Sequence, residues 1–252
     1  MPHLDIWNRY MRCYDFLNCV DSYSQNIRDI AKALEPRPGM KVLDAGSGTG
    51  NLSILLKLAG ANVVSCDFSQ SALQLHRAKD PYAELVKTSL EEPLPFGAQS
   101  FDAVCCASVL FALTQTGCCV AVNEFRRILK PTGRLIVTVG APAARNGNLI
   151  ALHLRGLSER HGRVRGWMKG VADLPALIQI LYYNRLLARL PDWHGFHRFT
   201  EAELRGLVAG AGFQQIDIRM TYGGCFFLLT AHAPAAAIPQ SQFQETSVAA
   251  VA

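Results

Sequence analysis

Between residues 40 and 140 the chain alternates short apolar runs with longer stretches whose apolar positions recur at helical spacing. The short runs are rich in Val, Leu, Ile and Cys, as expected of strands that are buried on both faces. Alternation of such strands with helices predicts a parallel sheet covered by helices, an α/β fold. The predicted strands are 41–44, 62–66, 83–87, 101–107 and 133–139, and the predicted helices are 52–58, 71–78 and 120–129.

The pattern differs on either side of this region. Residues 4–34 have helical spacing with scattered aromatic side chains, and a Pro-rich break follows them. After Gly140 the alternation stops, and a partly helical insertion is predicted. The alternation resumes at Thr200, which has Glu203 three residues later, the spacing of a capping box. Two final strands, at 215–221 and 225–231, are predicted to form a hairpin.

These changes divide the chain into five predicted parts. They are an N-terminal helical cap at 1–36, a core at 37–140, a substrate-lid insertion at 141–199, a C-terminal helix and hairpin at 200–233, and a disordered tail at 234–252. The tail is rich in Ala, Gln and Ser. Because the chain has 252 residues and is 50% hydrophobic, we expect the core and the hairpin to form one α/β domain.

Cysteine usage and the absence of targeting signals favour a cytoplasmic location. No apolar run reaches the roughly eighteen residues that span a bilayer, and the first residues lack the basic and apolar regions of a secretory signal. The eight cysteines occur singly or as neighbours, without a metal-binding spacing. We therefore expect buried, reduced thiols.

The net charge of +5 is concentrated in the predicted insertion. Residues 141–199 contain nine basic and three acidic residues, a net charge of +6, so the rest of the chain carries −1. The segment suits a solvated lid, an acidic substrate or peripheral contact with an anionic membrane. Nucleic acid is disfavoured because the basic residues are not interleaved with stacking aromatics. A leucine-rich stretch at 175–190 favours a lid over an apolar substrate or an interfacial helix.

A glycine-rich turn at 42–50 carries the most specific chemical signal. Gly46, Gly48 and Gly50 follow a predicted strand and precede a predicted helix, which is the arrangement that cradles nucleotide-like ligands. Asp44 stands before the glycines, where a carboxylate would repel a pyrophosphate but suit a cationic amine. Asn51 occupies the place where a dinucleotide fingerprint needs glycine, which disfavours NAD.

This combination resembles motif I of the class I S-adenosylmethionine (SAM) methyltransferases. Asp67 ends the second predicted strand, and family-like segments follow in order at LEEPLPF (90–96), SFDAV (100–104), FRRILKPTGRLIV (125–137) and FTEAELRGLVAGAGF (199–213). The resemblance implies a Rossmann-like seven-stranded sheet of order 3-2-1-4-5-7-6, with the last strand antiparallel and helices on both faces. It also implies SAM as the methyl donor and S-adenosylhomocysteine (SAH) as the product.

The resemblance assigns cofactor-binding roles residue by residue. Gly46, Ser47 and Gly48 would hold the methionine part of SAM, and Asp44 would lie near its ammonium group. Asp67 would accept hydrogen bonds from the ribose hydroxyls. The expected adenine and methyl-end contacts are Phe68, Ser89, Leu90 and Ala107.

Ser89 departs from the family pattern. Relatives often have Asp just before the apolar run that ends in Phe96, and that carboxylate accepts from the adenine amino group. A serine hydroxyl still accepts one hydrogen bond but carries no charge. We expect weaker SAM affinity, or replacement of the missing carboxylate by Glu91.

Three side chains are candidate proton acceptors for catalysis. His194 and His197 lie in the DWHGFHRF stretch at 192–199, and Tyr222 lies at the predicted hairpin turn. Solvated loop histidines and a tyrosine packed in the core are the competing interpretations. The two histidines lack a third metal ligand, so no metal site is expected.

The resemblance implies methyl transfer to a small-molecule acceptor, such as a quinone, a lipid or another apolar metabolite. The N-terminal Tyr-Asp-Phe segment and the apolar run that ends in Phe96 are similar to the branch that methylates quinones and phospholipids. The alternatives are a non-catalytic SAM- or SAH-binding partner, an RNA methyltransferase and a Rossmann oxidoreductase. The N-terminal cap and the insertion are expected to cover the acceptor.

Overall fold

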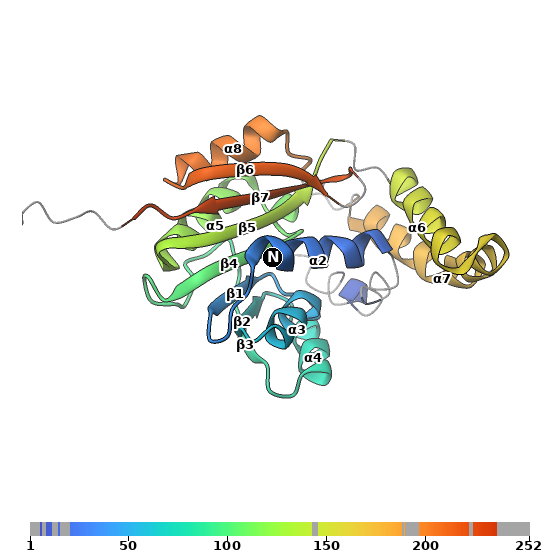
Figure 1. The fold of residues 1–252 in the computed structure, drawn as a ribbon, viewed down its shortest axis with the longest axis horizontal. Coiled ribbons are helices and arrows are strands. Elements are labelled where there is room, and N and C mark those ends of the chain that lie inside the picture. The colour runs from blue at the N-terminus through green and yellow to red at the C-terminus, as the bar shows by residue number, and fades with distance from the viewer. Residues whose placement is uncertain are drawn as a thin grey trace, which may run out of the picture.

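The computed structural model describes residues 6, 9–11, 15, 21–142, 146–187, 189, 197–221 and 224–235. A seven-stranded sheet of order β3-β2-β1-β4-β5-β7-β6 crosses the molecule, with helices on both sides (Figure 1). The first five strands in the chain run parallel, and β7 runs antiparallel to both β5 and β6. The sheet order predicted from the family resemblance is confirmed.

The strands follow the predicted apolar runs closely. Their bounds are β1 (Lys41–Ala45), β2 (Asn62–Asp67), β3 (Glu84–Lys87), β4 (Phe101–Ala107), β5 (Leu129–Gly140), β6 (Gln214–Thr221) and β7 (Phe226–His232). The helices are α2 (Asp21–Leu34), α3 (Asn51–Leu58), α4 (Gln70–Lys79), α5 (Gln115–Ile128), α6 (Asn146–His161), α7 (Arg163–Leu187) and α8 (Glu201–Gly210), with a 3₁₀ turn, η2, at Leu110–Ala112.

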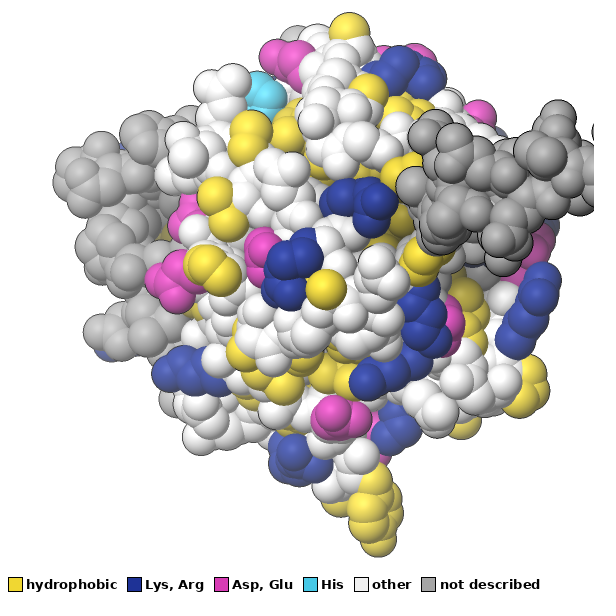
Figure 2. Space-filling view, turned by 90° about the vertical axis from the view of Figure 1, so that its left-hand side faces the viewer, with side chains coloured by type: hydrophobic (Ala, Val, Ile, Leu, Met, Phe, Trp, Pro, Cys, Tyr) yellow, Lys and Arg dark blue, Asp and Glu magenta, His cyan; other side chains and the backbone are white. Residues whose placement is uncertain are grey.

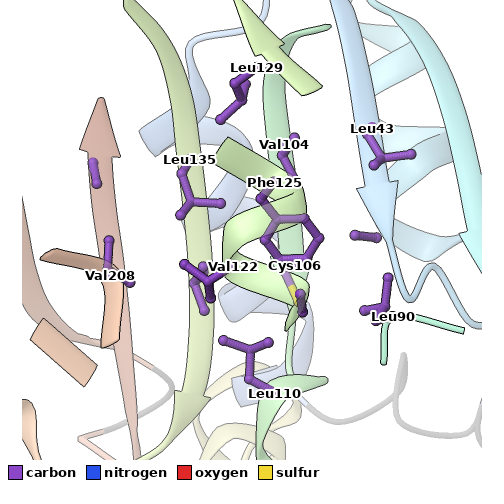
Figure 3. Close-up of a cluster of buried hydrophobic side chains, with 14 of the residues drawn as sticks. Leu43, Leu90, Val104, Cys106, Leu110, Val122, Phe125, Leu129, Leu135 and Val208 are labelled. Atoms are coloured by element: carbon purple, nitrogen blue, oxygen red, sulfur yellow. The ribbon is translucent and has the colours of Figure 1, made fainter. Parts of the chain in front are cut away.

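Two hydrophobic clusters fill the space between the sheet and its helices. Phe125 of α5 and Val208 of α8 pack on one face with Val104 and Leu135 of the central strands (Figure 3). On the other face the side chains of α2 and α3 pack against alternate residues of the same strands. Alternation of strand side chains between these clusters explains why the central strands are apolar throughout.

The start of β5 differs from the prediction, which placed it at residue 133. Leu129 already pairs with Phe101, and the next pair in the register joins Ala103 to Arg134. The residues between them bulge out of the ladder, and Thr132 adopts a φ of 59°. The predicted turn before this strand is therefore a bulge within it.

The insertion after β5 forms a pair of packed helices beyond the end of the sheet (Figure 1). Gly166 and Gly170 of α7 face α6 so closely that a Cβ at Gly166 would lie 2.8 Å from the carbonyl oxygen of Leu157. The buried side chain of His153 also lies 3.1 Å from Asp173, which joins α6 to α7. Helix α7 begins at Arg163, well before the leucine-rich stretch predicted at 175–190, and it continues past Pro175.

The end of the molecule opposite the α6–α7 pair faces the viewer in Figure 2. There the hydrophobic side chains are interspersed with basic and acidic ones.

Among the described helices, none is both long enough and apolar enough to cross a bilayer. The predicted tail lies almost wholly outside the described residues, as does much of the N-terminal cap before α2.

Candidate functional site

The glycine turn between β1 and α3 is fastened to the end of β2. The amides of Gly46 and Ser47 both donate to the carbonyl oxygen of Cys66, at 2.8 and 2.9 Å. Gly46 has a φ of 75°, and a Cβ there would lie 2.4 Å from a methyl group of Val109. Only glycine fits this position.

Gly48 differs from Gly46 because it faces open space. Its φ is 53°, and a Cβ placed on it would meet no atom within 4 Å. The hydroxyl of the neighbouring Ser47 is buried and has no hydrogen-bond partner among the described residues. The turn therefore presents the backbone of Gly48 to a space that a ligand can fill, next to a buried hydroxyl that has no partner among the described residues.

Asp44 is a buried acid at the carboxyl end of β1. Its side chain is 1% exposed, and its Oδ2 accepts a hydrogen bond from Ser53, whose hydroxyl also lies 2.8 Å from that of Ser65. Its Oδ1 has no partner among the described residues. Burial raises the pKa of Asp44 to about 6, and the nearby Asp67 charge adds to the rise. An unpaired buried carboxylate oxygen suits a ligand that brings a cation.

Asp67 ends β2 beside the same turn. Its Oδ2 accepts from the amide of Gly48 at 2.9 Å, and its Oδ1 accepts from the amide of Ser69 at 2.8 Å. Burial raises the pKa of Asp67, although both amide hydrogen bonds oppose the rise. Each carboxylate oxygen has a second lone pair, so Asp67 can still accept hydrogen bonds from two hydroxyl groups.

Comparison with known proteins identifies the family. A family model described as "Methyltransferase domain" matches residues 43–137. A demethylmenaquinone methyltransferase of Mycobacterium sp. (strain JLS) is 30% identical over 92% of this chain and 95% of its own length. The chain belongs to the class I SAM-dependent methyltransferases.

Other known proteins match a smaller part of this chain or match it with lower sequence identity. A demethylmenaquinone methyltransferase of Streptomyces avermitilis is 35% identical, but the match covers 49% of this chain and 54% of that protein. The chain thus aligns with about half the length of several curated relatives. A crystal structure of a SAM-dependent methyltransferase from Thermotoga maritima, described as a possible histamine N-methyltransferase, matches with a TM-score of 0.61 and 18% identity. The match covers 91% of this chain and 99% of that protein. That similarity shows the fold alone.

The residues of the glycine turn fit SAM, which is the cofactor of this family. SAM brings an ammonium group and two ribose hydroxyls. The unpaired oxygen of Asp44 suits the first, and the carboxylate of Asp67 suits the second. The open space over Gly48 leaves room for the methionine part.

The predicted adenine contacts lie just beyond β2 and β3. Phe68 is half-buried, and Leu90 is buried in the core cluster. The hydroxyl of Ser89 accepts from the amide of Glu91 at 3.2 Å. Glu91 does not replace the missing carboxylate in this structure, because its Oε1 accepts from the amide and hydroxyl of Thr114, the N-cap residue of α5.

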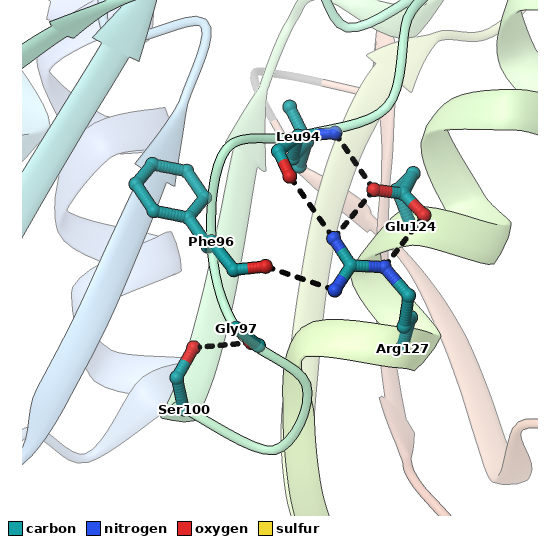
Figure 4. A network of polar contacts seen from close by, with 6 residues as sticks. All are labelled: Leu94, Phe96, Gly97, Ser100, Glu124 and Arg127. Carbon is teal, nitrogen blue, oxygen red and sulfur yellow. Dashed lines mark hydrogen bonds and ion pairs between the residues drawn. The ribbon is translucent and has the colours of Figure 1, made fainter.

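Arg127 and Glu124 of α5 hold the loop that follows Ser89 and Leu90 (Figure 4). The guanidinium of Arg127 donates to the carbonyl oxygens of Phe96 at 2.8 Å and Leu94 at 3.0 Å. Glu124 accepts from the amide of Leu94 at 2.7 Å and pairs with Arg127. The two family-like segments at 90–96 and 125–137 therefore bind each other.

The end of β4 lies across from the glycine turn. Ala107 is half-buried and pairs with Thr138, and the amide of Ser108 donates to the Thr138 carbonyl at 2.9 Å. Val109, the next residue, packs against Gly46. This arrangement brings Ala107 and Ser108 near the turn, where the methyl end of SAM is expected.

Of the three candidate bases, His197 lies within the residues that the structure describes. His197 is half-exposed, its amide donates to the Phe111 carbonyl at 2.9 Å, and its Nε2 lies 3.8 Å from Glu203. This places it between η2 and the start of α8. His194 and Tyr222 lie outside the described residues. Among the described residues, no group of three potential ligands could hold a metal ion.

Two contacts near the turn were not predicted from the sequence. Asp15 of the N-terminal segment accepts from the hydroxyl of Thr49 and from Lys79 Nζ at 2.9 Å. His76 of α4 is buried against Gly50, where a Cβ would lie 2.2 Å from its ring. Burial, helped by the charge of Lys79, lowers the pKa of His76 to about 4, so the ring is neutral at pH 7. Both contacts join residues that are distant in the sequence, so no local pattern indicates them.

Proposed function

We propose that this methyltransferase transfers the methyl group of SAM to the reduced form of a quinone-like small molecule. The similarity to the Mycobacterium demethylmenaquinone methyltransferase carries the proposal, because it extends over 92% of the chain. It therefore includes the cap and insertion as well as the cofactor-binding core. A hydroquinone is the nucleophilic form of such an acceptor, whereas the quinone is electron-poor.

When bound, SAM supplies a methyl group on a sulfonium centre, and its transfer breaks the S–CH3 bond, leaves the electron pair on sulfur and forms the bond to the acceptor. The protein has to align the acceptor and exclude water. In this proposal Asp44 binds the ammonium group and Asp67 the ribose hydroxyls, and Gly48 leaves room for the methionine part. In this proposal Phe68 lines the adenine side and Ala107 lies at the methyl end.

The cap and the insertion are proposed to cover the acceptor. Tyr10 and Met11 of the N-terminal segment pack with Ile180 and Leu187 of α7 and with Ala72 of α4. The helix pair also contacts α2. These contacts support a cover over the carboxyl edge of the sheet, built from parts that are distant in the sequence.

The proton that the acceptor loses needs a receiving group. His194, His197 and Tyr222 remain the proposed acceptors of this proton. His197 is supported by its position next to η2, which directly follows β4. We also propose a cytoplasmic location, which the buried free thiols of Cys66, Cys105 and Cys106 support.

Mass spectrometry of a reaction with SAM and a short-chain demethylmenaquinol tests the proposal. Formation of the methylated product together with SAH is the expected result. Tight SAH binding without turnover on quinols, phenols and lipids would instead favour the non-catalytic alternative, which the missing acid at Ser89 supports. Methylation of RNA but of none of the small acceptors would contradict the proposal.

A further inference from the structure

The outer face of α7 is apolar along most of its length. Among the described residues, seven of the eleven exposed large hydrophobic side chains lie on this helix: Val164, Trp167, Met168, Val171, Leu174, Ile178 and Tyr182. Their spacing of three and four residues places them on one side of the helix. These seven side chains are called the outer stripe below.

The outer stripe lies on the side of α7 that faces away from α6. The packed side carries Gly166 and Gly170, whose lack of a Cβ lets α6 approach closely, and it continues to Ile180 and Leu187. Pro175 lies on the exposed side, where the carbonyl that loses its hydrogen-bond donor can reach water. The stripe is therefore not the surface by which the two helices pack together.

Basic side chains flank the outer stripe. Arg163 and Arg165 are exposed beside its start, and Arg185 is exposed near its end. Lys169 is also exposed, on the side of α7 that is nearer to α6. None of the four has an ion-pair partner within the part of the chain that the structure describes. Trp and Tyr in the stripe combine an apolar ring with a polar edge, the character of side chains at a membrane–water interface.

From these observations we propose that the α6–α7 pair docks on the surface of an anionic lipid bilayer. The outer stripe would enter the headgroup region, and the basic side chains of Arg163, Arg165 and Arg185 would contact lipid phosphates. A second copy of this chain fits less well, because two faces of the same positive sign would meet. The opposite end of the molecule mixes both signs of charge with its hydrophobic side chains (Figure 2). The proposal concerns a surface outside the cofactor site and does not depend on the identity of the acceptor.

Flotation of the full-length protein with vesicles tests the docking. Vesicles of equal parts phosphatidylglycerol and phosphatidylcholine are compared with vesicles of phosphatidylcholine alone. Binding to the anionic vesicles should be at least about ten-fold tighter and should weaken with added salt. Equal binding to both vesicle types, or binding to neither, would overturn the proposal.

Three sets of substitutions assign the binding to α7. Trp167→Ser with Ile178→Ser removes two members of the stripe, and Arg163→Gln with Arg165→Gln and Lys169→Gln removes charge while keeping the stripe. Each of these two sets should weaken anionic-vesicle binding by about ten-fold or more. The matched control is Leu58→Ser with Tyr82→Ser, which changes side chains that are 81% and 91% exposed elsewhere. An equal loss in the control would contradict the assignment to α7.

Two further readouts separate the possible failures. SAH affinity and methylation of a water-soluble quinol should be the same in all three variants, because the substituted side chains are exposed and lie outside both the cofactor site and the contacts of Ile180 and Leu187 that are proposed to cover the acceptor. If vesicles do not bind but methylation persists, the docking fails and the proposed function stands. If vesicles bind but SAH does not, the proposed function fails and the docking stands. Dimerisation or RNA binding that requires the stripe, without vesicle binding, would assign the surface to that partner and overturn the proposal.

Discussion

The backbone amide of Gly48 donates a 2.9 Å hydrogen bond to Oδ2 of Asp67. The acid that is expected to hold the ribose therefore also fixes the turn that is expected to hold the methionine part. Because Oδ1 of the same side chain accepts from the Ser69 amide, Asp67 links β2, the turn and the start of α4. We therefore expect both cofactor binding and local folding to depend on this one carboxylate.

Asp67→Ala should weaken SAH binding by roughly 1–3 kcal/mol, because it removes buried hydrogen bonds to the ribose and frees the Gly48 amide. Titration calorimetry at pH 7 measures the loss. The ligand-free variant should also unfold at lower denaturant concentration. Glu84→Ala, which removes a surface carboxylate from neighbouring β3, is the control and should change neither value. Unchanged SAH affinity in Asp67→Ala would show that the cofactor lies elsewhere.

Asp44→Asn should raise the stability of the ligand-free protein but weaken cofactor binding. The pKa of Asp44 is raised from 3.8 to about 6, so the folded protein at pH 7 holds a charge that burial disfavours. Removing that charge should stabilise the ligand-free protein by on the order of 1–3 kcal/mol at pH 7. The gain should shrink as the pH falls through about 6, where the wild-type carboxyl takes up its proton. Thermal unfolding at several pH values measures this.

The same variant should bind SAH more weakly, because the ligand's ammonium group loses its carboxylate partner. In the wild type, SAH affinity should fall as the pH decreases below about 6, since protonated Asp44 no longer attracts a cation. Calorimetry between pH 5 and 8 tests this. A pH-independent affinity, or equal affinity in Asp44→Asn, would contradict the role of Asp44.

Gly50→Ala should destabilise the protein more than Gly48→Ala. Both glycines have positive φ, so both substitutions strain the backbone. A Cβ at Gly50 also collides with the buried ring of His76, whereas one at Gly48 meets nothing. We expect an additional loss of about 1–3 kcal/mol for Gly50→Ala, measured by urea unfolding. The double variant Gly50→Ala/His76→Ala should lose less than the sum of the single variants, and strict additivity would contradict the contact.

Arg127→Lys should loosen the loop that follows Ser89. Lysine cannot reproduce the forked contact with two backbone carbonyls and Glu124. We expect stability to fall by about 1 kcal/mol and SAH affinity to fall with it, since the loop continues directly from Ser89 and Leu90. The control is Arg126→Lys, which alters the neighbouring residue outside this network. Equal effects of the two substitutions would show that the network does not position the adenine side.

Local chemistry made much of the fold predictable. Thr200 and Glu203 form the capping box that their spacing predicts, and α8 ends at Gly210. The central strands are apolar runs between clear breaks, so they could be located. Their order in the sheet came from the family resemblance, because apolar runs alone do not specify which strands pair.

Most of the failures share a physical cause. The start of β5 depends on pairing between Leu129 and Phe101, which a turn-like Pro-Thr-Gly sequence conceals. The full length of α7 was not predicted because Pro175 usually interrupts a helix, whereas this helix accommodates it on its exposed side. Asp15 and His76 contact the glycine turn from other elements, and Glu91 accepts a hydrogen bond from Thr114. Apart from the length of α7, which depends on the exposed position of Pro175, each case depends on a contact across the fold.

The most direct measurement is a reaction with SAM that carries a deuterated methyl group and a short-chain demethylmenaquinol, analysed by mass spectrometry. Our account predicts a product in which one hydrogen of the quinol is replaced by the deuterated methyl, with an equal amount of SAH. Formation of that product should fall sharply in Asp67→Ala. Firm SAH binding with an unlabelled quinol would contradict the proposed function.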